Sequence, residues 1–315
     1  MRLVRNDTVL ANFHAERVMP LASTAKVIVA IEYAEQAAAG TINPDELVSL
    51  DELDRFYVAN TDGGAHPAWL SAVSEQVVDN QVPIREVAQG MINFSSNANT
   101  EWFSQRLGLA QINKQIGQLG VQNHTPVYYL VSSLFVGKER FPGATGAALE
   151  EQLRNLSAEE YIQATNEIHQ KLLNNPAYKE DVGDLSMNVQ RVWSDRLPAA
   201  TTADYVAIMK KINSRTFFDE STQQYLDEVL EGILANPANR QWLAHAGMKG
   251  GSTAFVLTKA LYATDRNGNQ TELAYFFNNL APEENALLQT SMNDFELKIL
   301  TDLAFRKHIQ QTMSQ

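Results

Sequence analysis

A serine and a lysine three residues apart, Ser23 and Lys26, are residue types that could do chemistry near the start of this 315-residue chain. If a helix begins near Ser23, this spacing puts both side chains on one face, one turn apart. The amine of Lys26 could then reach the hydroxyl of Ser23, which needs an adjacent base to become a nucleophile. The flanking residues are apolar, which predicts burial, and burial disfavours the charged form of a lysine. The pair is therefore a candidate nucleophile and base.

Two later segments could complete such a site. Ser95–Ser96–Asn97 falls in a predicted break after a helix over residues 84–93, where a hydroxyl and an amide could face one cleft. Lys249–Gly250–Gly251–Ser252 precedes a predicted strand, and its glycines allow close approach to the backbone. Taken alone, each of the three segments also fits a plain structural role, such as a helix cap, a polar loop or a turn. Their occurrence together, in this order, makes the chemical interpretation more specific.

The three segments resemble the Ser-x-x-Lys, Ser-Asp-Asn and Lys-Thr-Gly motifs of penicillin-binding proteins and serine β-lactamases. The class A β-lactamases are the most similar members. The resemblance extends to the residues flanking the first two motifs and to residues 197–202. It covers most of residues 1–131 and 197–300, and it does not clearly cover residues 132–196.

The resemblance implies catalytic roles for the matched residues. Ser23 would be the acylated nucleophile, and Lys26 would take or relay its proton. Ser95 would pass a proton to the leaving nitrogen, and Lys249 would keep the cleft positive and bind the substrate carboxylate. The backbone N–H groups of Ser23 and Ser252 would form the oxyanion hole, in which each donor typically contributes about 3–4 kcal/mol.

The resemblance also implies a substrate-binding set. Asn97 would contact the amide of the substrate, and Gly251, Ser252 and Thr253 would line the site beside it. The family has Ser or Thr where this chain has Gly250, so a hydroxyl that helps hold the substrate carboxylate is missing. Ser252 or Thr253 could supply that hydroxyl instead.

Two further departures concern acidic residues. Ser96 replaces the acidic residue of the second motif. The class A pattern Glu-x-x-Leu-Asn, which supplies the deacylating glutamate, does not occur between Ser95 and Lys249, and the segment at Glu150 comes nearest. Without a base to activate water, we expect the acyl-enzyme to turn over slowly.

Strand patterns at both chain ends and helical patterns between them predict an α+β fold. We expect one antiparallel sheet built from both ends and flanked by helices, with an inserted all-helical domain, as in β-lactamases and D,D-peptidases. The expected sheet domain spans residues 1–45 and 197–315, and the helical domain spans residues 46–196. A cleft between domains is where a site is expected. Within this scheme residues 147–174 are expected to be helical, residues 254–264 and 271–278 form strands, and the last helix starts near Pro282.

Composition excludes several classes of partner and cofactor. A net charge of −12 with no run of Lys or Arg argues against nucleic acid and anionic membrane surfaces. Cysteine is absent, and no apolar run approaches the roughly 18 residues of a membrane span. The six histidines show no pair at metal-ligand spacing, so we expect no metal and no cofactor. The expected partner is a small molecule, either a β-lactam or a peptide resembling D-Ala-D-Ala, and the expected state is a monomer.

The sequence therefore predicts a serine hydrolase of the β-lactamase type. One alternative is a penicillin-binding D,D-peptidase, or a small ester or amide hydrolase, with slow deacylation. Another is a non-catalytic module that binds a ligand in the same cleft. The resemblance implies export to the periplasm or outside the cell, and a part in antibiotic resistance. The first residues lack the apolar core of a signal peptide, so we expect either a trimmed chain or a cytoplasmic one.

Overall fold

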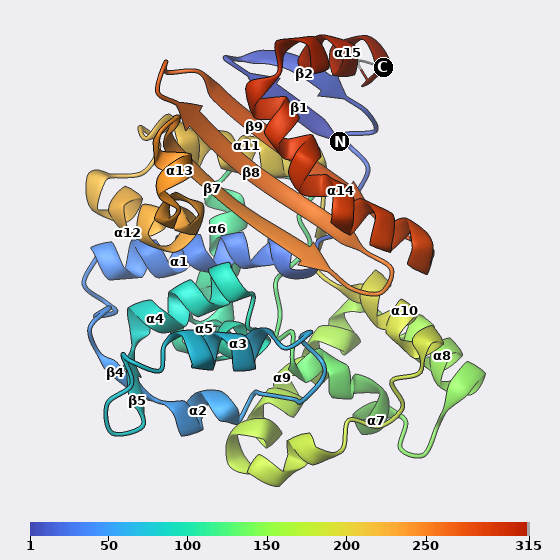
Figure 1. The fold of residues 1–315 in the computed structure, drawn as a ribbon. Helices are drawn as coiled ribbons and strands as arrows, with labels where there is room; N and C mark the ends of the chain where they lie inside the picture. Colours follow the sequence, from blue (N-terminus) through green and yellow to red (C-terminus); the bar gives the residue numbers. More distant parts are fainter. Residues whose placement is uncertain (314–315) are drawn as a thin grey trace. The chain divides into compact units, whose positions relative to one another are not determined.

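The main sheet is built from both ends of the chain, as the sequence predicts. The computed structural model describes residues 1–313, and it contains a five-stranded antiparallel sheet in the order β2-β1-β9-β8-β7 (Figure 1). The connection between β8 and β9 is a turn capped by Asp265, whose carboxylate accepts from Asn267 N and Asn269 N at 2.9 Å each. The strands are β1 (Arg2–Arg5), β2 (Thr8–Asn12), β7 (Leu243–Ser252), β8 (Leu257–Asp265) and β9 (Gln270–Phe277).

The alternation of side chains along β9 explains why helices cover both faces of this sheet. Leu273 packs in one apolar cluster with Ile299 and Ile309, from the two last helices. The neighbouring Glu272 points the other way and accepts from Asn213 Nδ2 at 2.6 Å. The helices of this part of the chain are α11 (Thr202–Ser214), α12 (Glu220–Leu230), α13 (Pro237–Arg240), α14 (Pro282–Thr301) and α15 (Leu303–Met313).

The chain forms two compact units. Unit 1 comprises Met1–Val27, Ile116–Thr125 and Pro198–Gln315, and it holds the five-stranded sheet. Unit 2 comprises Ile28–Gln115 and Pro126–Leu197. A compact unit need not be a domain that folds on its own. The domain boundaries predicted from the sequence therefore stay a prediction.

Unit 2 is helical apart from a two-stranded ribbon of β4 (Leu47–Ser49) and β5 (Gln81–Pro83). None of the helices within residues 1–313 is long and apolar enough to cross a membrane. Two helices of unit 2, α1 and α6, have one end in unit 1. The helices are α1 (Lys26–Ala38), α2 (Leu50–Asp54), α3 (Ala65–Ala72), α4 (Ile84–Gln89), α5 (Asn97–Leu107), α6 (Leu109–Gln118), α7 (Val136–Arg140), α8 (Gly146–Asn155), α9 (Ala158–Asn174) and α10 (Met187–Arg196).

Short helical turns and a small strand pair complete the chain. A π-helical turn, η2, occupies Gly90–Phe94. In unit 1, β3 pairs with β6. The remaining elements are β3 (Met19–Pro20), β6 (Ala199–Ala200) and the 3-10 turns η1 (Ala22–Ala25), η3 (Ser132–Phe135), η4 (Pro176–Glu180) and η5 (Gly232–Ala235).

The structure corrects the boundaries of two predicted helices. The helical stretch over residues 147–174 is two helices, because Ser157 and Glu160 form a capping box that starts α9. The last predicted helix also divides, since the Asp302 carboxylate accepts from Ala304 N at 2.8 Å and caps α15. In both places a short polar side chain satisfies backbone donors that a continuous helix would have paired.

A third correction concerns the Lys249 segment. A strand, β8, follows Lys249–Gly250–Gly251–Ser252 as predicted, but these four residues are themselves the end of strand β7. Their partners across the sheet are residues of β8, with Gly251 opposite Thr258. Glycine is depleted in strands, so this segment does not carry the usual sequence pattern of one.

Candidate active site

Ser23 and Lys26 start one turn apart. Ser23 lies in the 3-10 turn η1, and Lys26 is the first residue of α1. Residues three apart in a 3-10 turn lie above one another, so the two side chains leave the same side of the backbone. Lys26 is fully buried whereas Ser23 is half-buried. The hydroxyl is thus the outer member of the pair and the amine the inner one.

The backbone just before Ser23 is strained. Ala22 has φ of +46°, in the left-handed region that costs a residue with a side chain about 1–3 kcal/mol. Two hydrogen bonds hold this conformation, from Leu21 N to Pro198 O at 2.8 Å and from Thr24 N to Leu21 O at 3.0 Å. A turn that is held in a strained form by its surroundings presents the next residue in one fixed orientation.

Strand β7 lies directly against this turn at Gly251. A Cβ atom on Gly251 would lie 2.5 Å from Ser23 N, 2.6 Å from Leu21 O and 2.8 Å from Thr24 N. All three are backbone atoms, which cannot swing aside as a side chain could. Only glycine fits at this position, and it brings the backbone of β7 beside the amide of Ser23.

Two buried threonines attach the turn to the sheet. The hydroxyl of Thr258, on β8, donates to Leu21 O at 2.7 Å. Thr24 Oγ1 lies 2.8 Å from Thr258 Oγ1. Nothing in the sequence around Thr258 marks it as part of a site, because a threonine inside a strand is common.

Lys249 is a second buried lysine in unit 1. Only 5% of the residue is exposed, and its amine donates to Gly250 O at 2.9 Å. Burial, and to a smaller extent the neighbouring charge of Lys259, lower the pKa of Lys249 to about 7. Both protonation states are therefore populated near neutral pH, and an anion bound beside the amine would favour the cation.

The two residues that could supply the missing hydroxyl differ in their surroundings. Ser252 ends β7 and is exposed. Thr253 Oγ1 accepts from Phe255 N and Val256 N at 3.1 Å each, within the turn that leads to β8. Ser252 therefore has the more accessible side chain, whereas Thr253 stabilises the turn.

In unit 2, Ser95 occupies an irregular joint between two helices. It ends the π-helical turn η2 with φ of +69°, and Asn97 is the first residue of α5. Both residues are half-buried. The predicted break after residue 93 is therefore present, and the left-handed conformation of Ser95 sets the direction of its side chain.

Ser96, at the position of the family's acidic residue, has a structural role. Its hydroxyl oxygen accepts from Asn99 N at 3.2 Å, which caps α5, and the hydroxyl donates to Asn99 Oδ1 at 3.0 Å. His66 Nδ1 lies 2.9 Å from the same oxygen, and burial lowers the pKa of His66. His66 lies 30 residues before Ser96 with no motif around it, so the sequence does not indicate this contact.

A buried carboxylate on α5 was also missed. Glu101 is fully buried and accepts from Val131 N at 2.8 Å, from Ser132 N at 3.2 Å and from the Ser132 hydroxyl. His169 Nδ1 lies 3.1 Å from the same carboxylate. Glu150, by contrast, lies on α8 in a half-buried position. Glu101 thus organises the chain around η3 in unit 2, a segment that the resemblance does not clearly cover.

The predicted site residues divide between the two units. Unit 1 brings Ser23, Gly251 and the end of β7 together, and it also holds Lys26 and Lys249. Unit 2 holds Ser95 and Asn97 at the start of α5. The first set has the parts that acyl transfer requires: a hydroxyl, a buried amine one turn away and a backbone amide beside a strand.

Comparison with known proteins gives the chain a family. The sequence profile of the Beta-lactamase enzyme family matches residues 2–219, more than two thirds of the chain. No curated protein sequence matches it.

Solved structures of β-lactamases share the fold. A β-lactamase from Sphaerobacter thermophilus is 15% identical, with a TM-score of 0.58 over 96% of this chain and 91% of that one. A class A β-lactamase from Bacteroides cellulosilyticus is 15% identical, with a TM-score of 0.56 over 95% and 90%. A mutant of PBP-A, in an acyl-enzyme complex with penicillin G, is 15% identical, with a TM-score of 0.52 over 98% and 88%. Identities this low show similarity of fold alone.

The lowered pKa of Lys249 gives a testable prediction. We expect its amine to titrate near pH 7, and we expect the midpoint to move upward in Lys259→Met, because that variant removes a neighbouring positive charge. The measurement is a pH titration of the lysine side-chain NMR shifts, assigned with Lys249→Met. Lys307→Met, at an exposed position of α15, should leave the midpoint unchanged. A midpoint above pH 10 in the unmodified chain would contradict the prediction.

Proposed function

Because the chain belongs to the Beta-lactamase enzyme family, we propose that it is a serine hydrolase that opens β-lactam amides through an acyl-enzyme on Ser23. The observation that carries this proposal is the contact of β7 with the η1 turn. Gly251 lies against Ser23 N, and Lys26 is buried one turn beyond Ser23. A nucleophile, an inner base and a backbone donor are thus arranged around one turn.

In the first step Lys26, as the neutral amine, takes the proton of the Ser23 hydroxyl while Oγ attacks the carbonyl carbon. The carbonyl oxygen becomes an oxyanion, which accepts hydrogen bonds from the N–H groups of Ser23 and Ser252. Collapse of the tetrahedral intermediate breaks the C–N bond, and Ser95 passes a proton to the leaving nitrogen. The product is an ester on Ser23 with an opened ring. The short approach of β7 to the turn supports the oxyanion hole, since it brings the strand that ends with Ser252 beside the amide of Ser23.

Substrate binding in this proposal depends on Lys249 and Asn97. Lys249 binds the substrate carboxylate as the cation, and Asn97 contacts the substrate amide. Gly251, Ser252 and Thr253 line the site, and the Ser252 hydroxyl replaces the one that Gly250 lacks. The exposed end of β7 supports this assignment of Ser252.

Deacylation is the step for which the sequence offers no residue that matches the family's general base. The family's Glu-x-x-Leu-Asn pattern is absent, and Glu150 lies on helix α8. This absence favours an acyl-enzyme that persists, which is the behaviour of a penicillin-binding D,D-peptidase or of a slow ester or amide hydrolase. We therefore keep that function as the second candidate. The proposal also includes export from the cytoplasm, a monomeric state and a contribution to antibiotic resistance.

The test of the proposed function is turnover of a chromogenic cephalosporin and of a peptide ending in D-Ala-D-Ala. We expect Ser23→Ala to lower kcat/KM by about 10³-fold or more, because no other group can carry the acyl chain. Ser291→Ala, an exposed serine on α14, is the matched control and should keep full activity. Unchanged turnover in Ser23→Ala would sink the assignment of the nucleophile. Reversible binding of a β-lactam without turnover or adduct would support a non-catalytic module instead.

A second prediction concerns the oxyanion hole. We expect Gly251→Ala to slow acylation by about 10²-fold, because its Cβ would displace the backbone that holds the Ser23 amide. Gly250→Ala should stay within a few-fold, since its nearest contact would be an ordinary 3.5 Å. Stopped-flow acylation rates, with circular dichroism to verify folding, give the comparison. Equal rates for the two variants would show that the contact does not position the donor.

A further inference from the structure

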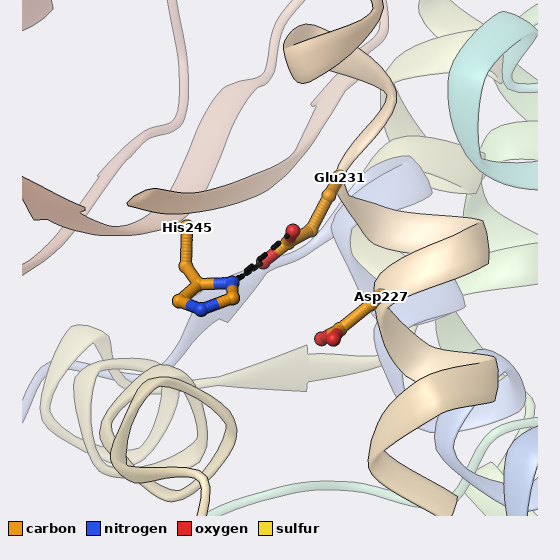
Figure 2. A group of neighbouring side chains, drawn as sticks. All are labelled: Asp227, Glu231 and His245. Carbon is orange, nitrogen blue, oxygen red and sulfur yellow. Dashed lines mark hydrogen bonds and ion pairs between the residues drawn. The ribbon is translucent and has the colours of Figure 1, made fainter. Parts of the chain in front are cut away.

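Three potential metal ligands meet at the end of α12, outside the residues assigned above (Figure 2). Asp227 and Glu231 are four residues apart at the C-terminal end of that helix, so their carboxylates lie on one face. His245 comes from strand β7, and its ring faces the Glu231 carboxylate. One ligand atom from each residue lies within 4.8 Å of the other two.

The spacing of these atoms suits a small tetrahedral ion. Zn²⁺ binds histidine nitrogen and carboxylate oxygen at about 2.0–2.2 Å, which places two ligands of one tetrahedron about 3.3–3.5 Å apart. His245 Nδ1 lies 3.3 Å from Glu231 Oε1, the length of one such edge. An Asp227 oxygen lies within 4.8 Å of both other ligand atoms, and it must move closer to become the third ligand.

A buried amide beside the cluster points to a missing partner. Gln223 precedes Asp227 by one turn, and its Nε2 donates to Asp227 Oδ1 at 2.9 Å. The residue is only 3% exposed, and its Oε1 is buried without a hydrogen-bond partner among residues 1–313. Such oxygens are rare, because leaving one unpaired costs about 1–3 kcal/mol. The oxygen shares its carbon with the Nε2 that contacts Asp227, so a water bound to an ion at the cluster could give it a partner.

The Glu231 carboxylate lies beside a tyrosine hydroxyl and at the end of a helix. Glu231 Oε1 accepts from the Tyr262 hydroxyl at 3.2 Å. The negative end of the α12 dipole attracts a cation at this position.

Arg215 occupies part of this space. Its guanidinium donates to Asp227 Oδ1 at 3.0 Å and to Asp227 Oδ2 at 2.6 Å, and it lies 3.1 Å from His245 Nδ1. The Arg215 charge is therefore paired with Asp227. A divalent ion would replace the contact between Arg215 and His245.

We propose that Asp227, Glu231 and His245 form a binding site for a divalent transition-metal ion, Zn²⁺ in the first place, which joins α12 to β7. The site is independent of the proposed hydrolase activity. It lies on the strand that carries Lys249 and Gly251, so a bound ion would stabilise that strand through its link to α12. The spacing of the histidines along the sequence does not indicate this metal site, because the carboxylates come from the end of a helix and His245 follows Glu231 by 14 residues, on a strand.

The test is calorimetric titration of the full chain with ZnCl₂ at pH 7. We expect one saturable site per chain. His245→Gln and Asp227→Asn should each weaken binding at least tenfold. Arg215→Gln should strengthen it, because that variant removes the competing cation. His308→Ala, at an exposed histidine of α15, is the matched control and should bind as the unmodified chain does.

Thermal melting with and without Zn²⁺ gives a second readout for any variant that folds poorly. Zn²⁺ should raise the melting temperature of the unmodified chain and of His308→Ala, and it should leave that of Asp227→Asn unchanged. Equal affinity in His245→Gln, Asp227→Asn and the unmodified chain would overturn the proposal. So would the absence of saturable binding in the unmodified chain at millimolar Zn²⁺.

Discussion

The contact between two backbones, at Gly251 of β7 and at the η1 turn, is the constraint on which the candidate site depends. No side chain separates the strand from Ser23 N, because a Cβ at Gly251 would lie 2.5 Å from that nitrogen. The Thr258 hydroxyl fixes the same turn through Leu21 O. A backbone donor held in this way needs no reorganisation when charge develops on a bound substrate, and preorganisation of this kind makes the largest contribution in many enzymes.

The unit that contains this contact also contains two buried lysines. Lys26 and Lys249 are both almost completely removed from water, and burial of an ammonium group opposes folding. Burial is also the main reason why the pKa of Lys249 is lowered to about 7. Such groups persist where they have a use, because the neutral amine is a base and the cation binds an anion. Lys249 is thus close to its protonation equilibrium near neutral pH.

The sequence predicted the parts of the fold that depend on local pattern. The strands at both ends and the helix start near Ser23 follow from apolar patterns and residue spacing. The end of β7 was not predicted as a strand, since its glycines interrupt the alternation of apolar and polar residues that indicates one. The partnership of Ser96 with His66, and the cluster at Glu231 and His245, depend on tertiary contacts that no local pattern records. The boundaries of the two domains and the roles of the site residues stay predictions.

The most direct test of the central claim is the mass of the intact chain after mixing with a penicillin, followed by peptide mapping. The proposed acyl-enzyme predicts an increase equal to one whole penicillin molecule, because ring opening loses no atoms. The added mass should lie on the peptide that contains Ser23, and it should persist, since the deacylating glutamate pattern is absent. Added mass on a different peptide, or the same adduct on Ser23→Ala, would contradict the account.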